Sequence, residues 1–263
     1  MELSNFINET LDLCAAELLP RFRAGLEVRT KADASLVTEA DLASERVALA
    51  RIKNSFPDDI ILSEETHTSA ARRPEGAYVW IVDPLDGTTN FANGYPYFCV
   101  SIARGVFRAD GSIQVVAGGI IDPVRGKKYT AQIGRGAFVD GVPLCIRANR
   151  PLAKTFLVTG FYFTDPERLL PEVDRFARVA RFCPAIRRDG AAALDLALVA
   201  EGIFDAFWEN GLQVWDVAAG SLLVSEAGGA VCNYSGDAGS YNLEATGIVA
   251  GNPATVAAIA ALL

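Results

Sequence analysis

The sequence is poor in histidine: His67 is the only one among 263 residues, and this scarcity excludes several kinds of chemistry. Zinc sites built from several histidines are ruled out, and Ser-His-Asp hydrolysis or phosphohistidine chemistry would depend on this one residue. His67 directly follows Glu64-Glu65-Thr66, and we interpret it as part of a surface loop. The chemistry is therefore expected to use other side chains.

Common phosphate-binding motifs are missing as well. No Walker loop occurs, and Gly134-Arg135-Gly136 lacks the third glycine of a dinucleotide-binding fingerprint. No two aspartates stand two residues apart, as the D-x-D motif of aspartyl-phosphate phosphatases requires. Carboxylates, hydroxyls and the backbone remain as the candidate reactive groups.

Paired cysteines and long apolar runs are absent from the sequence. Five scattered cysteines without a C-x-x-C pair predict neither a disulfide framework nor a zinc knuckle, and they fit a reducing cytoplasm. The N-terminus has no basic segment followed by an apolar run, and no stretch has the length of a membrane span. We therefore expect a cytoplasmic protein without a membrane partner.

Basic residues are in deficit, with 24 Lys and Arg against 32 Asp and Glu and a formal net charge of -8. This balance disfavours a nucleic-acid partner, and it would repel a phosphorylated substrate unless cations screened the site. The 51% hydrophobic content with 21% charged residues predicts a globular chain with a large core.

Hydrophobic periodicity predicts a sheet-rich half, residues 1–150, and an α/β half, residues 151–263, packed as one unit with a soft boundary near Arg150 and Pro151. Thr38 and Asp41 form the pattern of a capping box at the start of the second helix. The expected helices span residues 3–18, 42–52, 166–181, 191–200, 217–226 and 254–262. The expected strands span residues 59–63, 78–82, 98–106, 113–121, 129–137, 156–159, 204–208, 230–233 and 247–250.

Chemistry concentrates in the segment Ile81 to Phe91, which reads IVDPLDGTTNF. Asp83 ends a buried strand, and a tight turn through Pro84 can bring its carboxylate together with that of Asp86 and the Leu85 carbonyl. These hard oxygen ligands suit Mg²⁺, which keeps waters and substrate phosphate in its coordination shell. The plain alternative is that the two aspartates cap a surface turn.

The sequence resembles the inositol monophosphatase family of Mg²⁺-dependent, lithium-sensitive sugar phosphatases. Trp80 to Phe91 matches the first signature of that family, and Trp215 to Gly229 matches the second. Shorter matches occur at residues 31–41, 63–65 and 190–209, so the resemblance covers nearly the whole chain. It implies an α+β fold, the layered α-β-α-β-α sandwich of sugar phosphatases, and a homodimer.

The resemblance also implies a site for two or three Mg²⁺ ions. Glu64, Asp83 and the Leu85 carbonyl would hold the first ion, and Asp83, Asp86 and Asp216 would hold the second. Glu64 would also contact a weaker third ion. The resemblance thus places positive charge between the carboxylates and the phosphate.

The implied reaction is direct in-line attack of metal-activated water on phosphorus. The N–H groups of Gly87 and Thr88 would receive the phosphate. Thr88, oriented by Asp41, would position the water together with Glu64. The catalytic residues implied by the resemblance are therefore Glu64, Thr88 and Asp41.

Several of these residues have a plainer interpretation. Glu64 could belong to an ordinary solvated acidic pair, and Thr38 with Asp41 could do no more than cap a helix. Asp216 could be an N-cap beside a core Trp215. Capping by Asp41 and orientation of Thr88 are compatible.

The resemblance implies a small phosphorylated polyol, inositol monophosphate, as the substrate. Glu209 occupies the position of a glutamate that contacts the polyol in the family, and Asp86, Ala192 and Asp216 complete the expected substrate site. The run Arg187 to Ala191 lacks the hydroxyl residue that often follows its glycine in the family, and it adds Asp189. The alternatives are a broader, fructose bisphosphatase-like enzyme, a histidinol or nucleotide phosphatase, and a regulatory binding protein that retains the fold.

Overall fold

The computed structural model describes residues 2–24, 28–30, 36–66, 74–161, 165–234, 236 and 241–263. His67 and residues 31–35 of the family resemblance lie outside the described residues. Within the described part of the chain, no helix has both the length and the apolar character that crossing a membrane requires.

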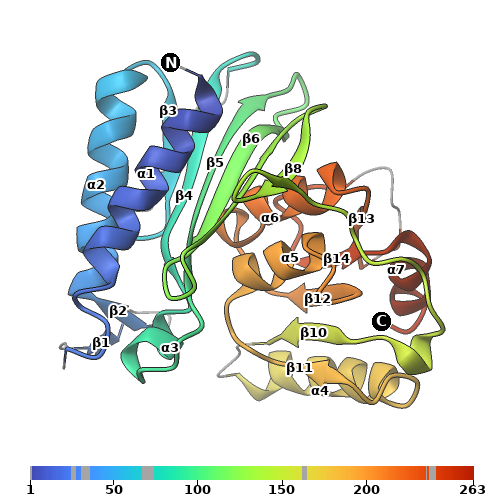
Figure 1. Ribbon diagram of the computed structural model, residues 1–263. Coiled ribbons are helices and arrows are strands. Elements are labelled where there is room, and N and C mark those ends of the chain that lie inside the picture. The colour runs from blue at the N-terminus through green and yellow to red at the C-terminus, as the bar shows by residue number, and fades with distance from the viewer. Residues whose placement is uncertain are drawn as a thin grey trace.

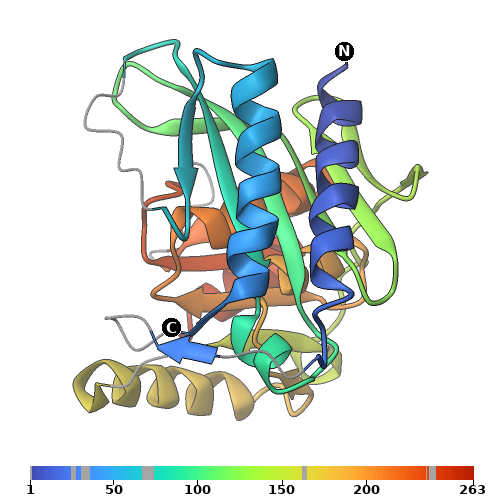
Figure 2. The same cartoon turned by 90° about the vertical axis from the view of Figure 1, so that its left-hand side faces the viewer.

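Five layers stack in the order helices, sheet, helices, sheet, helices (Figure 1). Helices α1 and α2 lie side by side on the outer face of the first sheet (Figure 2). Helices α5 and α6 fill the space between the two sheets, and α4 and α7 cover the outer face of the second. The expected layered α-β-α-β-α fold is confirmed.

The first sheet has seven strands in the order β3-β4-β5-β6-β7-β8-β9. β3 is parallel to β4, and every later pair is antiparallel. The strands are β3 (Ile60–Ser63), β4 (Tyr78–Asp86), β5 (Cys99–Phe107), β6 (Ile113–Asp122), β7 (Lys127–Gln132), β8 (Gly136–Val139) and β9 (Val142–Pro143). A separate antiparallel pair joins β1 (Val28–Thr30) to β2 (Leu36–Thr38).

The second sheet has five strands in the order β11-β10-β12-β14-β13. β10 runs parallel to both β11 and β12, whereas β14 is antiparallel to β12 and β13. The strands are β10 (Leu157–Gly160), β11 (Ile186–Arg187), β12 (Ala206–Asn210), β13 (Ala230–Asn233) and β14 (Gly247–Gly251).

Most of the predicted helices are confirmed. The helices are α1 (Leu3–Leu18), α2 (Glu39–Ser55), α3 (Thr88–Ala92), α4 (Pro166–Ala180), α5 (Ala192–Ala200), α6 (Val214–Glu226) and α7 (Pro253–Ala260), with a 3-10 turn at Leu152–Lys154. α1 has the predicted bounds because its apolar residues form one buried stripe. Thr38 and Asp41 make the predicted capping box of α2.

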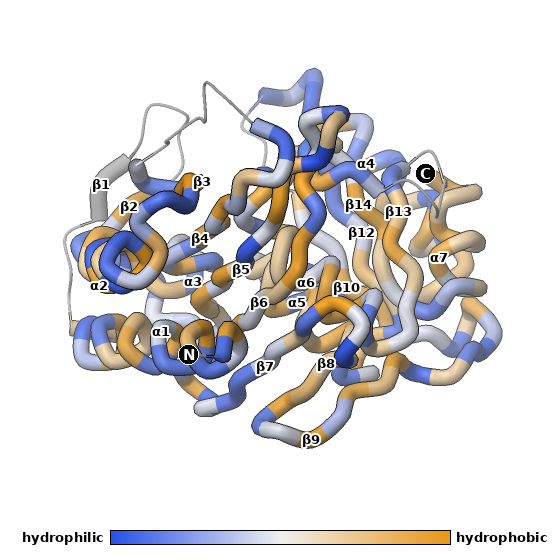
Figure 3. Tube along the Cα trace, turned by 90° about the horizontal axis from the view of Figure 1, so that it is seen from above, coloured by the Kyte–Doolittle hydropathy of each residue, from blue (hydrophilic) through white to orange (hydrophobic). Residues whose placement is uncertain are grey.

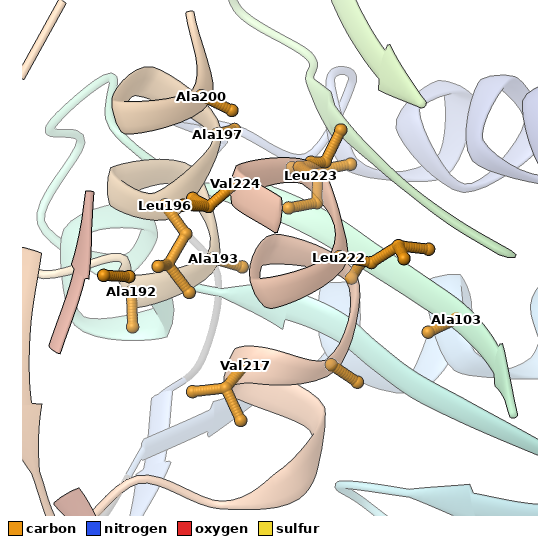
Figure 4. Packing of buried hydrophobic residues seen from close by; sticks show 14 of the residues in the cluster. Ala103, Ala192, Ala193, Leu196, Ala197, Ala200, Val217, Leu222, Leu223 and Val224 are labelled. Atoms are coloured by element: carbon orange, nitrogen blue, oxygen red, sulfur yellow. The ribbon is translucent and has the colours of Figure 1, made fainter. Parts of the chain in front are cut away.

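Hydrophobic residues, the orange segments of the tube in Figure 3, are frequent in the strands and helices that pack against one another, and the core is built from them. The central layer is built from small and large apolar residues of α5 and α6, including Ala193, Ala197 and Leu223 (Figure 4). Gly220 brings these two helices together, because a Cβ there would lie 2.5 Å from the Cβ of Leu196. The tight central layer holds α5 and α6 in place against both sheets.

Two predicted elements of the first sheet are wrong. Residues 129–137 were expected to be one strand, but β7 ends at Gln132 and a turn with positive φ at Gly134 and Gly136 starts β8. Strand β4 was expected to end near Val82 before a tight turn, but it continues to Asp86. The small elements β1, β2, β9 and β11 were not predicted.

Candidate active site

The D-P-L-D segment is an irregular end of β4 rather than a turn. Opposite β5, the pairs Asp83↔Ser101 and Asp86↔Cys99 leave one extra residue in β4. Such a bulge re-aims side chains at the end of a strand. The Asp83 Oδ1 accepts a 3.0 Å hydrogen bond from the Leu85 N–H, so the bulge holds the first carboxylate in place.

Helix α2 stabilises this bulge through a hydrogen bond. The Ser44 hydroxyl of α2 donates a 2.8 Å hydrogen bond to the Pro84 carbonyl, and both residues are buried. Proline cannot donate to the ladder, and the irregular backbone here leaves carbonyls to be satisfied by side chains. Ser44 therefore fixes the backbone between the two aspartates.

Gly87 connects β4 to α3 and must be glycine. Its φ is +91°, and a Cβ would lie 3.1 Å from the Tyr97 carbonyl oxygen and 3.2 Å from the Ala191 Cβ. The left-handed conformation strains any other residue, and the close packing adds to the cost of a side chain. Gly87 is the N-cap of α3, a short helix that was not among the predicted ones.

The Thr88 hydroxyl lies between two acceptors. It is 2.9 Å from Asp41 Oδ1 and 3.1 Å from the Leu85 carbonyl oxygen. The other oxygen of Asp41 accepts hydrogen bonds from the Thr38 N–H at 2.7 Å and the Thr38 hydroxyl at 2.6 Å. Burial raises the pKa of Asp41, and these hydrogen bonds oppose that rise. Asp41 therefore caps α2 and orients Thr88 at the same time.

Asp86 joins the first sheet to the central helices. Its Oδ2 accepts a 2.7 Å hydrogen bond from the Ala193 N–H in the first turn of α5, and the Cys99 Sγ lies 3.6 Å away. A carboxylate at a helix N-terminus is favoured by the helix dipole. The same contact places Ala192, the first residue of α5, beside the motif.

Asp216 lies inside the first turn of α6. Its carboxylate accepts a 2.7 Å hydrogen bond from the Gln213 N–H, in a capping box in which Gln213 is the N-cap. The interpretation of Asp216 as an N-cap is wrong, because α6 begins at Val214 rather than Val217. The Ser101 hydroxyl contacts the Trp215 carbonyl at 3.3 Å and so ties this turn to β5.

Glu64 follows the end of β3, and its N–H donates a 3.2 Å hydrogen bond to the Val82 carbonyl of β4. The turn around it is held by Glu45 of α2, a carboxylate with 3% exposure. Glu45 Oε1 accepts hydrogen bonds from the Ser63 hydroxyl at 2.5 Å and the Thr66 N–H at 3.2 Å. Glu64 and Glu65 are both half-buried.

The carboxylates of the site repel one another. Burial raises the pKa of Asp83 well above its usual value, and the negative charges of Glu64, Asp86 and Asp216 raise it further. Burial also raises the pKa of Asp86 to about 7, although the Ala193 N–H opposes the rise. Repulsion of this kind is relieved by a cation bound between the carboxylates.

In the described residues, no three Cys, His, Asp or Glu side chains are already arranged as a ready-made metal site. The mutual effects on the pKa of Asp83 nevertheless place the carboxylates within electrostatic reach of one another. All of the donors are hard oxygens, which is the chemistry that Mg²⁺ prefers. The donor set therefore fits Mg²⁺.

Glu209 of β12 lies near these aspartates, with 9% exposure. Burial, followed by the charges of Asp216 and Asp86, raises the pKa of Glu209 well above its usual value, whereas Arg188 lowers it. The loop before α5 is tied to α3 by the Asn90 side-chain amide, which donates a 2.8 Å hydrogen bond to the Asp189 carbonyl. Electrostatic effects thus link Asp83, Asp86, Asp216, Glu64 and Glu209 to one another, and the Thr88 hydroxyl links Asp41 to this group.

Sequence reasoning missed Glu45, Ser44, Cys99 and Ala193. Glu45 carries the clearest signal, because it stands four residues after Asp41 on the same helix, where a shared face is expected. Cys99 and Ala193 become neighbours of Asp86 through tertiary contacts alone.

A profile of the Inositol monophosphatase family matches residues 2–263. The chain belongs to the inositol monophosphatase family. The protein called Nus factor SuhB of Pseudomonas aeruginosa is 41% identical over 231 residues, which cover 86% of this chain and 82% of the relative.

Solved structures of the family agree with this fold. The extragenic suppressor protein SuhB of Bartonella henselae has a TM-score of 0.86 at 33% identity, covering 98% of this chain and 96% of the other. The inositol monophosphatase of Anabaena (Nostoc) sp. PCC 7120 has a TM-score of 0.82 at 34% identity, covering 98% and 94%. This chain is accordingly a phosphatase of the inositol monophosphatase superfamily, whose members generally depend on Mg²⁺.

Proposed function

We propose that this protein is a Mg²⁺-dependent phosphomonoesterase that hydrolyses inositol monophosphate to inositol and phosphate. The observation that carries the proposal is that the negative charges of Glu64, Asp86 and Asp216 act on the buried Asp83, in the strand that leads into the Gly87 junction. Mutual repulsion among buried carboxylates favours a divalent cation, and a divalent cation attracts a phosphate ester.

In this proposal Glu64, Asp83 and the Leu85 carbonyl would hold one Mg²⁺, and Asp83, Asp86 and Asp216 would hold a second. Glu64 would also contact a weaker third ion. Mg²⁺, when bound, supplies Lewis acidity that polarises the phosphate and lowers the pKa of water. The backbone N–H groups of the Gly87 turn bind the phosphate oxygens.

The protein side chains place the attacking water. The Thr88 hydroxyl directs its proton to Asp41 Oδ1, 2.9 Å away, so its lone pairs are available to accept a hydrogen bond from water. Glu64 accepts the proton that the water loses as it attacks phosphorus. Asp41 is buried, and its second oxygen is bound to Thr38, so it holds Thr88 in one orientation.

The polyol lies between α5 and β12 in this proposal, where Ala192, Glu209, Asp86 and Asp216 face it. The buried Glu209 carboxylate suits hydroxyl donors better than a second phosphate, because like charges repel. This supports a monophosphate of a polyol over a bisphosphate substrate. The named inositol monophosphatase of Anabaena supports inositol as the polyol.

A second role is suggested by the relatives named Nus factor SuhB, a name that bears on transcription partners. The formal net charge of -8 favours a protein partner over nucleic acid for any such role. We further propose a cytoplasmic homodimer. Five free cysteines fit a reducing compartment.

The test is a substrate panel with the purified protein, assayed in Mg²⁺ and in excess chelator. The panel contains inositol monophosphate, fructose bisphosphate, adenosine bisphosphate, histidinol phosphate and an aryl phosphate. We expect the highest kcat/KM for inositol monophosphate, no turnover in chelator, and recovery when Mg²⁺ is restored. Asp83→Asn, purified in the same way, controls for contaminating phosphatases and should be inactive.

Four outcomes contradict the proposal. Robust hydrolysis in excess chelator would overturn the metal-dependent mechanism. A preference for fructose bisphosphate would establish the broader sugar phosphatase, and a preference for the nucleotide or histidinol ester would establish that branch. A thermal shift with Mg²⁺ but no turnover of any ester would favour the regulatory protein.

A further inference from the structure

Gly160 and Glu209 are neighbours across two parallel strands of the second sheet. They are register partners at the ends of β10 and β12. All four residues of β10 are buried, and Glu209 is 9% exposed. A glycine weakens a strand unless another group must approach the backbone closely, so its presence here requires an explanation.

The Glu209 carboxylate occupies the space that a side chain at position 160 would need. A Cβ at Gly160 would lie 2.1 Å from Glu209 Oε2, 2.4 Å from Oε1 and 2.4 Å from Cδ. These distances are far inside van der Waals contact, and all three involve the carboxylate group itself. The backbone of Gly160 forms the floor on which this carboxylate lies.

The backbone conformation of Gly160 does not itself demand glycine. Unlike Gly87, Gly160 is not among the glycines with positive φ. The group that a Cβ would meet is the end of a flexible side chain rather than fixed backbone. An alanine is therefore compatible with the strand, provided that the Glu209 carboxylate moves by roughly 1 Å to restore normal contact.

The Glu209 carboxylate has its oxygens available for a ligand. Among the described residues, no hydrogen bond to this side chain is seen. Burial and the charges of Asp216 and Asp86 disfavour its ionised form by raising its pKa. A largely buried carboxylate of this kind gains most from hydroxyl donors that a substrate brings. Its position then decides which hydroxyls it can reach.

We propose that Gly160 is a specificity-determining residue, which sets the position of the Glu209 carboxylate and thereby the selection among polyol phosphates. The inference rests on the proposed function, because it takes Glu209 to contact the substrate hydroxyls. Displacement of a positioned group by about 1 Å is enough to lose a directional hydrogen bond. The chemistry at phosphorus lies with other residues, so the loss falls on recognition.

The experiment is a double-mutant cycle of Gly160→Ala and Glu209→Ala, assayed on inositol monophosphate, a second polyol phosphate and an aryl phosphate at saturating Mg²⁺. Gly160→Ala is expected to lower kcat/KM for inositol monophosphate roughly tenfold or more, with a changed order among the polyol esters. Its kcat/KM for the aryl ester should stay at the wild-type value. In the Glu209→Ala background, Gly160→Ala should have no further effect, because the group it displaces is gone.

The outcomes separate the two proposals. If the wild type does not prefer polyol esters, or if Glu209→Ala leaves that preference intact, the proposed substrate site fails, and the role of Gly160 fails with it. If Glu209→Ala abolishes the preference while Gly160→Ala retains it, the role of Gly160 alone is refuted. Equal losses on all esters from Gly160→Ala would also refute it.

Melting temperatures provide a readout that does not depend on activity. Gly160→Ala should lower the melting temperature more in the wild-type background than in the Glu209→Ala background. Should the single variant fail to fold, recovery of folding in the double variant would identify the Glu209 carboxylate as the group displaced. Equal destabilisation in both backgrounds would show that the strand, not Glu209, requires glycine.

Discussion

Replacing Asp86 by asparagine separates the two tasks assigned to this side chain. Asparagine keeps the size of aspartate, and its carbonyl oxygen can still accept the hydrogen bond that the Ala193 N–H donates over 2.7 Å. What is lost is the negative charge. The charge at the N-terminus of α5 stabilises the helix by about 0.3–1 kcal/mol, and its removal also relieves repulsion by Glu64, so the fold should change little.

The loss in kcat should be far larger than the loss in folding stability. If Asp86 holds the second cation, its neutralisation removes electrostatic help worth about 3–4 kcal/mol in the transition state, or roughly 10²-fold to 10³-fold in kcat. A stability change of about 1 kcal/mol moves the melting temperature by only about 2–4 °C in a chain of this size. Both quantities should be measured on one preparation at saturating Mg²⁺.

The matched control is Asp165→Asn. Asp165 is the N-cap of α4 and accepts a 3.0 Å hydrogen bond from the Glu167 N–H, far along the chain from the metal motif. Asparagine is an equally good cap, so both stability and turnover should match the wild type. Turnover of Asp86→Asn within the range of this control would mean that the carboxylates of β4 are structural, and the assignment of the site would be wrong.

Three further results are expected. Glu45→Gln should lower kcat and weaken activation by Mg²⁺ while KM changes little. The reason is that the Ser63 hydroxyl, whose contact holds the turn before Glu64, loses its charged acceptor. An unchanged Mg²⁺ activation curve would argue against this positioning role. Asp205→Ala should lower the free energy of unfolding by about 2–3 kcal/mol, because it removes the buried partner of Arg150, and chemical denaturation that shows no change would contradict this. Lithium at millimolar concentration should inhibit turnover, as the family resemblance implies, and insensitivity in a steady-state assay would count against that resemblance.

The sequence predicted elements best where one periodic pattern decided the structure. The bounds of α1 follow from a single apolar stripe, and the capping box of Thr38 and Asp41 follows from local chemistry. The bulge at Asp83 was not predicted, because D-P-L-D has the composition of a turn and its pairing with β5 is a tertiary fact. The same limit explains the hairpin at Gly134, where two glycines interrupt an otherwise continuous strand pattern.

The candidate site was predictable as a set of residues but not as a set of contacts. The two signatures named Asp83, Asp86 and Asp216, whereas the donor that holds Asp86 is the backbone N–H of Ala193. A backbone donor leaves no mark in the sequence, since almost every residue type carries one. The role of Gly160 also leaves no mark in the sequence, because only the register of β10 and β12 places Glu209 next to it.

The contact between Asp86 and Ala193 also orders events during synthesis of the chain. The two residues are 107 positions apart, and Asp216 follows later still. The ribosome therefore synthesises the D-P-L-D segment well before its partners exist. A nascent chain that stops short of α6 holds the carboxylates of β4 without the helices that complete their surroundings. If Asp216 holds a metal ion as proposed, phosphatase activity can appear only after α6 has been translated and has docked between the sheets, and the onset of turnover would mark that docking.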